Sequence, residues 1–278
     1  MSVKIVTDSA CDLPDHLLSE LGIAIVPLTI RFGDEEFIDR VELQSEEFWR
    51  RCSSSEILPE TAAPSPGAFE TAYRAALSEG FDEVVTINLS GAMSATIQAA
   101  DAAAKAVSDL IRVEIVDSRT VSMGLGSLVL QAAREARAGA DAATIAAHIR
   151  DAAERTIVLA ALDTLENLKK GGRIGGAASM LGSLLSIKPI IEVVDGKVES
   201  NSKQRTRAKA LDFLLESVQN AGEIESLAVM HARCDDLDTF IARLREIHSG
   251  EIVVGDIGAV IGSHAGTGVM GVTYQVPA

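Results

Sequence analysis

The sequence predicts an α/β protein of two domains, an N-terminal parallel-sheet α/β/α domain and a C-terminal mixed-sheet α+β domain. Its 278 residues exceed the length of a typical single domain and suit two. Up to residue 155, short β-branched runs alternate with helical segments, which is typical of a parallel sheet. Beyond that point a hairpin and mixed segments replace the alternation. We therefore place the boundary between residues 158 and 159, giving lobes of residues 1–158 and 159–278.

The first half begins as strand, turn and helix. Residues 3–6 form an apolar strand closed by Thr7, Asp8 and Ser9, and the helix that follows is bounded by Pro14 and Gly22. The next elements are a second strand over residues 23–32, a hairpin or exposed connection over residues 33–43, and a helix that begins at residue 45.

Three prolines, Pro59, Pro64 and Pro66, predict an extended linker before the next helix. The alternation then continues as a helix over residues 67–79, a strand over 82–88, a loop with an alanine-rich helix over 90–107, a strand over 112–116, and helices over 123–139 and 141–155. The second half is predicted to contain a strand from 156, a hairpin over 189–203, a helix over 207–220, a strand over 226–232, a helix over 235–248, and a final mixed segment over 251–276.

A basic glycine turn lies between the first strand and the hairpin of the second half. Lys169 and Lys170 end a helix at Gly171 and Gly172, and Arg173 follows where its planar cation could face a carboxylate or phosphate. The small and apolar residues 175–185 favour a core helix, and the wall of an apolar cavity remains the alternative.

Composition excludes several classes of function. A net charge of -15 argues against a nucleic-acid partner, because phosphate backbones attract clustered lysine and arginine. The three cysteines have no zinc-type spacing, so we expect a reduced, cytoplasmic setting and no metal site. The N-terminus lacks the apolar run of a signal peptide, and no uncharged stretch is long enough to cross a membrane. We therefore expect a soluble protein without an integral membrane segment.

Several polar residues stand where a ligand could bind, and each has a structural alternative. Asp8 with Ser9, and Asp117 with Ser118, follow strands and could form a binding rim or cap the next turn. Thr61 lies in the proline-held segment, where it is a linker residue or a ligand contact. The hydroxyls of the loop after residue 88 could hold an anion at a helix N-terminus, although helix capping accounts for one of them: Ser90, Ser94 and Thr96.

The C-terminal glycine-rich segment contains a candidate histidine and a motif that we reject. Gly266, Gly268 and Gly271 match the dinucleotide-binding string, but no helix can follow them. His264 lies among glycines and could donate to an anion. The sequence shows no G-x-S-x-G elbow, HExxH or P-loop. The pattern indicates binding chemistry without its own catalytic machinery or cofactor.

Seven collinear segments resemble the DegV family: TDSACDLP (7–14), TAAPSPGAF (61–69), LSGAMSATIQAA (89–100), VDSRTVSMGLG (116–126), LKKGGRI (168–174), SIKPII (186–191) and GSHAGTGVMG (262–271). The resemblance implies one long-chain fatty acid in the cleft between the two domains, as in the fatty-acid-binding subunit of bacterial fatty acid kinase. A separate, ATP-dependent kinase subunit would phosphorylate the carboxyl group to acyl phosphate.

The resemblance also implies roles for individual residues. Thr61, Ser94 and His264 would hold the carboxylate, with further head-group contacts from Ser90, Thr96 and Gly266. Two arginines would face the kinase or the phosphoryl group, Arg173 and Arg205. The acyl chain would be lined by Ile174, Met180, Leu181 and Leu184. The sequence departs from the family pattern at Ala62 and Ala63, where serine and glutamine are usual.

Two other classes of function remain open. The first is a stand-alone small-molecule enzyme related to dihydroxyacetone kinases, which the missing nucleotide motif disfavours. The second is a regulatory interaction protein, for which a filled interior without a ligand cavity would be the sign.

Overall fold

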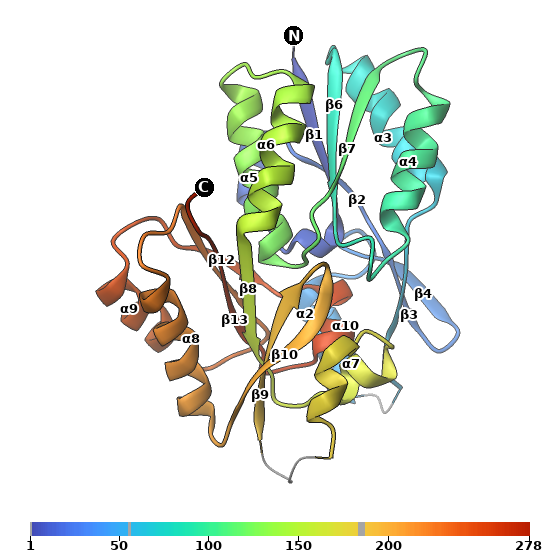
Figure 1. The fold of residues 1–278 in the computed structure, drawn as a ribbon. Coiled ribbons are helices and arrows are strands. Elements are labelled where there is room, and N and C mark those ends of the chain that lie inside the picture. The colour runs from blue at the N-terminus through green and yellow to red at the C-terminus, as the bar shows by residue number, and fades with distance from the viewer. Residues whose placement is uncertain (1, 55–56, 183–186) are drawn as a thin grey trace.

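The computed structural model describes residues 2–54, 57–182 and 187–278 and contains the two expected kinds of sheet (Figure 1). The N-terminal lobe is built on a four-stranded sheet in the order β2-β1-β6-β7, with all neighbours parallel. Its strands are β1 (Val3–Asp8), β2 (Ala24–Val26), β6 (Glu83–Asn88) and β7 (Arg112–Asp117). Every residue of β6 is buried. Burial on both faces agrees with the β-branched residues Val84, Val85 and Ile87, and the polar side chains of the strand are buried as well.

Helices cover both faces of this sheet. The helices α3 (Pro66–Ser78) and α4 (Thr96–Ala106) lie on one face, and α5 (Met123–Arg137) and α6 (Ala142–Arg155) lie on the other (Figure 1). Ser65 caps α3 by accepting a hydrogen bond from Ala68 N, and Pro66 occupies the first helical position. The lobe also contains η1 (Ser9–Cys11) and α1 (Asp15–Leu21).

The predicted second strand is wrong in one respect, because residues 23–32 form two strands in different sheets. Proline lacks a backbone N–H, and Pro27 separates β2 from β3 (Thr29–Phe32). β3 is the centre of an antiparallel sheet in the order β4-β3-β5, which we call the small sheet. Its other strands are β4 (Glu35–Ile38) and β5 (Glu60–Ala62). The predicted proline-held linker therefore includes a short strand.

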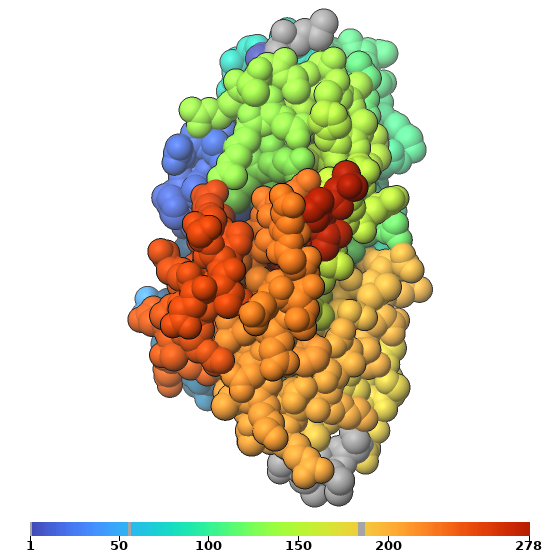
Figure 2. All heavy atoms as spheres, turned by 60° about the vertical axis from the view of Figure 1, so that its left-hand side comes forward, coloured from blue at the N-terminus to red at the C-terminus, as the bar shows by residue number. Residues whose placement is uncertain are grey.

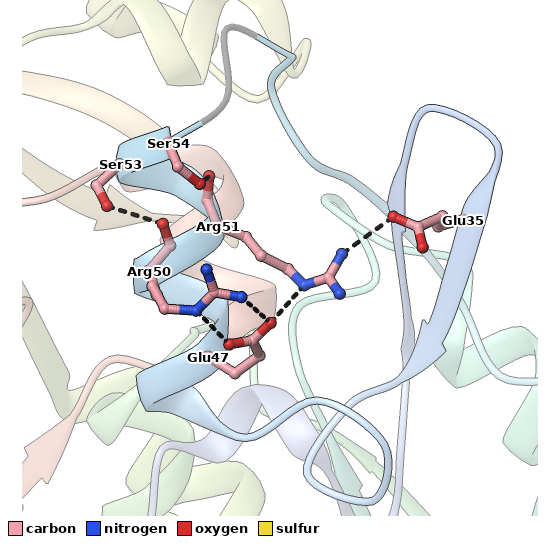
Figure 3. Close-up of polar contacts among 6 residues, drawn as sticks. All are labelled: Glu35, Glu47, Arg50, Arg51, Ser53 and Ser54. Carbon is pink, nitrogen blue, oxygen red and sulfur yellow. Dashed lines mark hydrogen bonds and ion pairs between the residues drawn. The ribbon is translucent and has the colours of Figure 1, made fainter.

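The helix α2 (Ser45–Ser54) is held against the small sheet by a charged network (Figure 3). Arg51 donates to Glu35 Oε2 at 3.0 Å and to Glu47 Oε1 at 2.8 Å, so one guanidinium joins the helix to β4. The same guanidinium stacks over the ring of Phe37, with 4.6 Å from Cζ to the ring centroid. Exposed ion pairs contribute little individually, but this arrangement fixes the relative orientation of helix and hairpin.

The C-terminal lobe is built on a six-stranded mixed sheet in the order β10-β9-β8-β13-β11-β12. Only β11 and β12 run parallel in it, and the other neighbours are antiparallel. The strands are β8 (Thr156–Ala161), β9 (Lys188–Val194), β10 (Lys197–Gln204), β11 (Ser226–His231), β12 (Val253–Asp256) and β13 (Met270–Gln275). β8 joins this sheet from Thr156, and the domain boundary after residue 158 stays a prediction.

One face of the mixed sheet carries α8 (Arg207–Ala221) and α9 (Leu237–Ile247), and the other turns toward the N-terminal lobe. Figure 2 shows α8 and α9 on the outside of the molecule, with the C-terminus beside the N-terminal lobe. At that point Arg155 Nη1 donates to Val276 O at 2.6 Å. Within residues 2–54, 57–182 and 187–278, none of the helices combines the length and apolar character needed to cross a membrane.

The segment after α7 (Glu166–Lys170) differs from the predicted core helix. It forms a short 3-10 helix, η2 (Gly175–Met180), packed on β10. A Cβ atom on Gly175 would collide with Val198 O, and one on Gly176 would collide with Glu199. These small residues permit close contact between backbones, and a core helix would have needed apolar side chains on a continuous stripe.

Candidate functional site

A cavity of about 200 Å³ lies between the two lobes. The N-terminal half contributes apolar side chains that include Leu28, Leu89 and Met93. The C-terminal half contributes the larger share of the lining residues. The inner face of the mixed sheet forms the longest part of the wall. Val158, Ala160 and Leu162 lie at alternate positions along β8 and just beyond it, as expected for side chains on one face of a strand.

The β9–β10 hairpin continues this wall. Ile191 pairs with Ala160, and Val193 pairs with Val198, so the inner faces of three neighbouring strands present apolar side chains to one space. The interior is therefore hollow between the lobes and is lined mainly by aliphatic groups. Such a space suits a hydrocarbon, because moving each methylene from water to an apolar site contributes about 0.8 kcal/mol.

Polar groups gather at one end of the cavity, where Thr61 and His264 form a hydrogen bond of 2.9 Å between Oγ1 and Nε2. Pairing of β5 with β3 places Thr61 opposite Ile30. His264 comes from α10 (Ala259–Ala265), a helix that sequence reasoning missed. The structure thus brings together two residues that are 203 positions apart in the chain.

Contact with α2 fixes the position of α10. A Cβ atom on Gly262 would lie 2.7 Å from Phe48 Cε1 and 2.8 Å from the ring of Trp49, so the two helices meet closely at this glycine. Trp49 Nε1 also donates to Ile257 O at 3.2 Å, just before α10 begins. The charged network of Figure 3 holds the same helix α2 against the small sheet, which carries Thr61. The helix α2 therefore contacts both the sheet that carries Thr61 and the helix that carries His264.

His264 is neutral at physiological pH. Burial lowers its pKa to about 4, and the positive charge of Arg173 contributes in the same direction. A neutral imidazole carries one N–H donor and one acceptor nitrogen. The buried Nδ1 has no hydrogen-bond partner within the described part of the chain. His264 can therefore donate a hydrogen bond to an anion while its imidazole stays uncharged.

Arg173 lies at the mouth of the cavity. Its Nε donates to Met93 O at 3.2 Å and its Nη1 to Gly171 O at 2.8 Å, and the side chain is exposed. The bond to Met93 O joins the glycine turn of the C-terminal lobe to the loop of the N-terminal lobe that carries Ser94. Ser94 lines the cavity, and its hydroxyl lies 2.9 Å from Thr96 Oγ1. Thr61, Ser94, His264 and Arg173 thus all line the cavity, and Arg173 bonds to the residue before Ser94.

Other predicted head-group residues lie outside the cavity lining. Ser90 Oγ donates to Gly196 O at 2.6 Å, which ties the tip of the β9–β10 hairpin to the N-terminal lobe. Thr96 is fully buried at the start of α4, and Gly266 ends α10 beside Asn167. Arg205 is exposed just after β10 and lines neither this cavity nor the chamber beside it. The structure groups Arg173, but not Arg205, with the polar end.

The four residues predicted to line the acyl chain are not among the described residues that line this cavity. Ile174, Met180 and Leu181 are absent from the described lining of the cavity, and Leu181 is 40% exposed. Leu184 lies outside the residues that the structure describes. The segment η2 packs on β10, and its buried residues Ala177 and Met180 belong to the same apolar core as the cavity wall without lining the cavity. The longest part of the wall comes from the strand residues named above, and the alternating apolar pattern of their strands was the sequence signal that could have found them.

The Asp-Ser pairs after β1 and β7 have structural roles, which decides between the two sequence interpretations. Asp8 accepts hydrogen bonds from Ala10 N, Leu89 N and Asn88 Nδ2. Its burial raises its pKa to about 6. Asp117 accepts from the backbone N–H groups of Gly91 and Arg119. Both carboxylates organise loops around the cavity and line none of it.

Comparison with known proteins agrees with this architecture. The family model described as "Uncharacterised protein, DegV family" matches residues 2–276. A DegV domain-containing protein of Deinococcus radiodurans is 36% identical over 280 residues, which cover 99% of each chain. The structure of a DegV family protein from Thermus thermophilus, described for its fatty acid binding, has a TM-score of 0.89 and 33% identity. That of DegV, a fatty acid binding protein from Bacillus subtilis, has a TM-score of 0.87 and 28% identity.

Both structural alignments cover 100% of each chain, so the similarity extends over both lobes. No group of three or more histidine, cysteine, aspartate or glutamate residues within the described ranges is arranged to hold a metal ion. With a family model that spans residues 2–276 and relatives that match from end to end, this chain is a member of the DegV family.

Proposed function

We propose that the protein binds one long-chain fatty acid between its lobes and presents the carboxyl group to a separate, ATP-dependent kinase subunit. The observation that carries the proposal is the Thr61–His264 pair at the polar end of an aliphatic cavity. The acyl chain would lie along β8, β9 and β10. The carboxylate would accept hydrogen bonds from Thr61, Ser94 and His264. Fatty acid binding by the similar proteins from Thermus thermophilus and Bacillus subtilis supports this assignment.

The protein would act as a carrier in the cytoplasm, without a metal or cofactor and without catalysis of its own. In the reaction of the partner, a carboxylate oxygen would attack the γ-phosphorus of ATP, and ADP would leave as acyl phosphate forms. Arg173 at the cavity mouth would face the incoming phosphoryl group or the kinase. Its guanidinium suits either role, because it binds phosphate and carboxylate oxygens through paired N–H groups.

Organic extraction of the purified protein followed by mass spectrometry tests the binding role. We expect close to one fatty acid per chain, or saturable uptake of added hexadecanoic acid after delipidation. Repeated absence of both would contradict the proposal. ATP consumption by the isolated chain with a small-molecule substrate would instead favour a stand-alone enzyme. Formation of acyl phosphate only when a kinase subunit is added would support the carrier role.

A further inference from the structure

A second, more polar chamber of about 520 Å³ adjoins the apolar cavity. The two spaces share three lining residues, which are Thr61, Arg173 and His264. The other lining residues of the chamber include Asn167 and Lys170 from α7 and Ser263 from α10. Figure 1 shows α7 beside α10, and a Cβ atom on Gly171 would collide with His264 Nδ1. The polar end of the cavity therefore opens into this chamber.

The chamber has a cationic side. Lys170 and Arg173 both line it, on either side of the glycine turn that ends α7. Lys170 Nζ lies 3.7 Å from Glu166 Oε2, a loose pair on an exposed helix that leaves the ammonium able to bind another anion. Glu60 also lines the chamber and lies 3.9 Å from Arg31 Nη1, so its charge is partly offset. The lysine and the arginine thus give this side of the chamber a positive potential.

The geometry decides what such a chamber can hold. A fatty acid with its chain among β8, β9 and β10 has its carboxylate at Thr61 and His264, where the two spaces meet. Any group added to that carboxylate must project away from the chain, and the chamber is the space that touches the same residues on the other side. Phosphorylation adds three oxygens and replaces the single negative charge of the carboxylate by up to two on the phosphoryl group, so the acyl phosphate requires more donors and more cations.

We propose that this chamber is a binding site for a phosphoryl head group, with Lys170 and Asn167 as its contacts beyond Arg173. The inference rests on the proposed function, because it places the phosphorylated form of the same lipid. Lys170 supplies the second cation that the sequence resemblance assigned to Arg205. After transfer, the acyl chain stays in the apolar cavity, and the phosphoryl oxygens accept hydrogen bonds from Lys170, Arg173 and the Asn167 amide.

Two lipid probes of equal chain length test the site, hexadecanoic acid and hexadecyl phosphate. Each displaces a fluorescent fatty acid from delipidated protein, and the dissociation constants are compared between variants. We expect Lys170→Gln to weaken hexadecyl phosphate binding about tenfold, since a charge-assisted hydrogen bond is lost. Hexadecanoic acid should change by less than about twofold, because the carboxylate contacts are intact. Asn167→Ala should weaken the phosphate probe selectively as well.

Lys169→Gln is the matched control, because Lys169 is an exposed neighbour with the same charge that does not line the chamber. If Lys169→Gln and Lys170→Gln weaken hexadecyl phosphate binding equally, the loss comes from general electrostatics and the proposed site is overturned. An equal loss for both probes in Lys170→Gln, or no loss for either, would also overturn it. If hexadecanoic acid fails to bind the unmodified protein, the carrier function is wrong. Binding of hexadecyl phosphate to the unmodified protein and to the variants then still tests the chamber as a phosphoryl site. Failure of hexadecyl phosphate to bind overturns that site.

Discussion

The polar end of the cavity depends on one neutral imidazole held by one hydroxyl. Thr61 Oγ1 and His264 Nε2 can exchange donor and acceptor roles across their 2.9 Å hydrogen bond. A protonated histidine could only donate, and burying its charge beside Arg173 would cost free energy. Recognition of a carboxylate at this site therefore relies on directed hydrogen bonds, with Arg173 at the mouth as the nearby cation.

The titration of His264 tests this description. Because burial lowers its pKa to about 4, the imidazole resonances in the NMR spectrum of delipidated protein should not shift between about pH 5.5 and pH 8. The resonances of the exposed His148 can be assigned by substituting that residue, which separates them from those of His264. A midpoint for His264 near the ordinary value of 6.5 would contradict a buried, neutral imidazole.

Substitution of Ser94 tests the carboxylate contacts. We expect Ser94→Ala to raise the dissociation constant for hexadecanoic acid roughly three- to tenfold, because one hydrogen-bond donor to the head group is lost. Ser179→Ala serves as a control, because its exposed hydroxyl donates to Ser200 Oγ at 3.2 Å and the residue does not line the cavity. Equal affinities for Ser94→Ala and the unmodified protein would remove Ser94 from the site.

Sequence reasoning found the chemistry of this site but could not separate its hydroxyls. Ser90, Ser94 and Thr96 lie within seven residues of one loop, and each suits a helix N-terminus equally well. Tertiary contacts decide between them. Ser90 bonds to the hairpin tip, Thr96 is buried at α4, and only Ser94 lines the cavity. The position of the second lobe, which no local pattern encodes, makes this selection.

At the scale of elements, the packing of α10 on α2 governs the placement of His264. Gly262 lies against Phe48 and Trp49, and the helix is only seven residues long. A displacement of the glycine would therefore be transmitted to His264 two positions later. The residue just before this helix is Gly258, whose N–H donates to Asp12 Oδ1 at 3.0 Å. Two contacts with the N-terminal half thus hold a short helix in a fixed position.

Gly262→Ala should disturb both stability and binding. The added Cβ would lie 2.7 Å from Phe48 Cε1, so the aromatic rings or the helix must shift. Overpacking of this kind costs about 1–3 kcal/mol. Urea unfolding and hexadecanoic acid affinity measure the two effects. Gly67→Ala is the matched control in α3, where the nearest atom to the new Cβ is 3.7 Å away. If both variants behave alike, close packing at Gly262 is not what positions His264.

Strand and helix patterns predicted most elements, and the errors have specific physical causes. Pro27 divided a β-branched run that propensity alone favoured as one strand. The helix α10 was missed because glycines at positions 258, 262 and 266 suggested a loop, although Gly262 is required by helix packing. Residues 175–180 carry small side chains because two backbones meet there, which their apolar character alone does not distinguish from a core helix.

At the scale of the whole molecule, contacts at several points close the two lobes over the cavity. On one side the hairpin tip is held by Ser90, which bonds to Gly196 O, and by an ion pair between Arg119 and Asp195. Elsewhere Gly258 N donates to Asp12 Oδ1 across the lobes at 3.0 Å, and Ser122 Oγ donates to Asp12 Oδ2 at 2.5 Å within the N-terminal lobe. These contacts join positions far apart in sequence, so the closed cavity could be expected only from the family resemblance.

Asp12 makes this closure sensitive to pH. Burial is the largest influence on its carboxyl group and raises its pKa to about 7, against the lowering effect of Ser122 and Gly258. An unfolded chain releases this proton near 3.8. Between these values the folded protein holds more protons than the unfolded protein at this site. The contribution of the protonated group to stability is therefore complete below about pH 4 and is lost as the pH rises through 7.

Asp12→Asn removes that titration while keeping a side-chain oxygen that can accept from Gly258 N. We expect the unmodified protein to lose about 3 kcal/mol of stability relative to the variant between pH 4.5 and pH 8, because folding raises the pKa of the carboxyl group from 3.8 to about 7. Urea unfolding across this range measures the difference. Asp236→Asn should show the opposite dependence. The unmodified protein should lose stability relative to that variant as the pH falls, because Arg207 holds the pKa of Asp236 below its usual value. Parallel stability curves for Asp12→Asn and the unmodified protein would mean that the lobes close without a titrating group at residue 12.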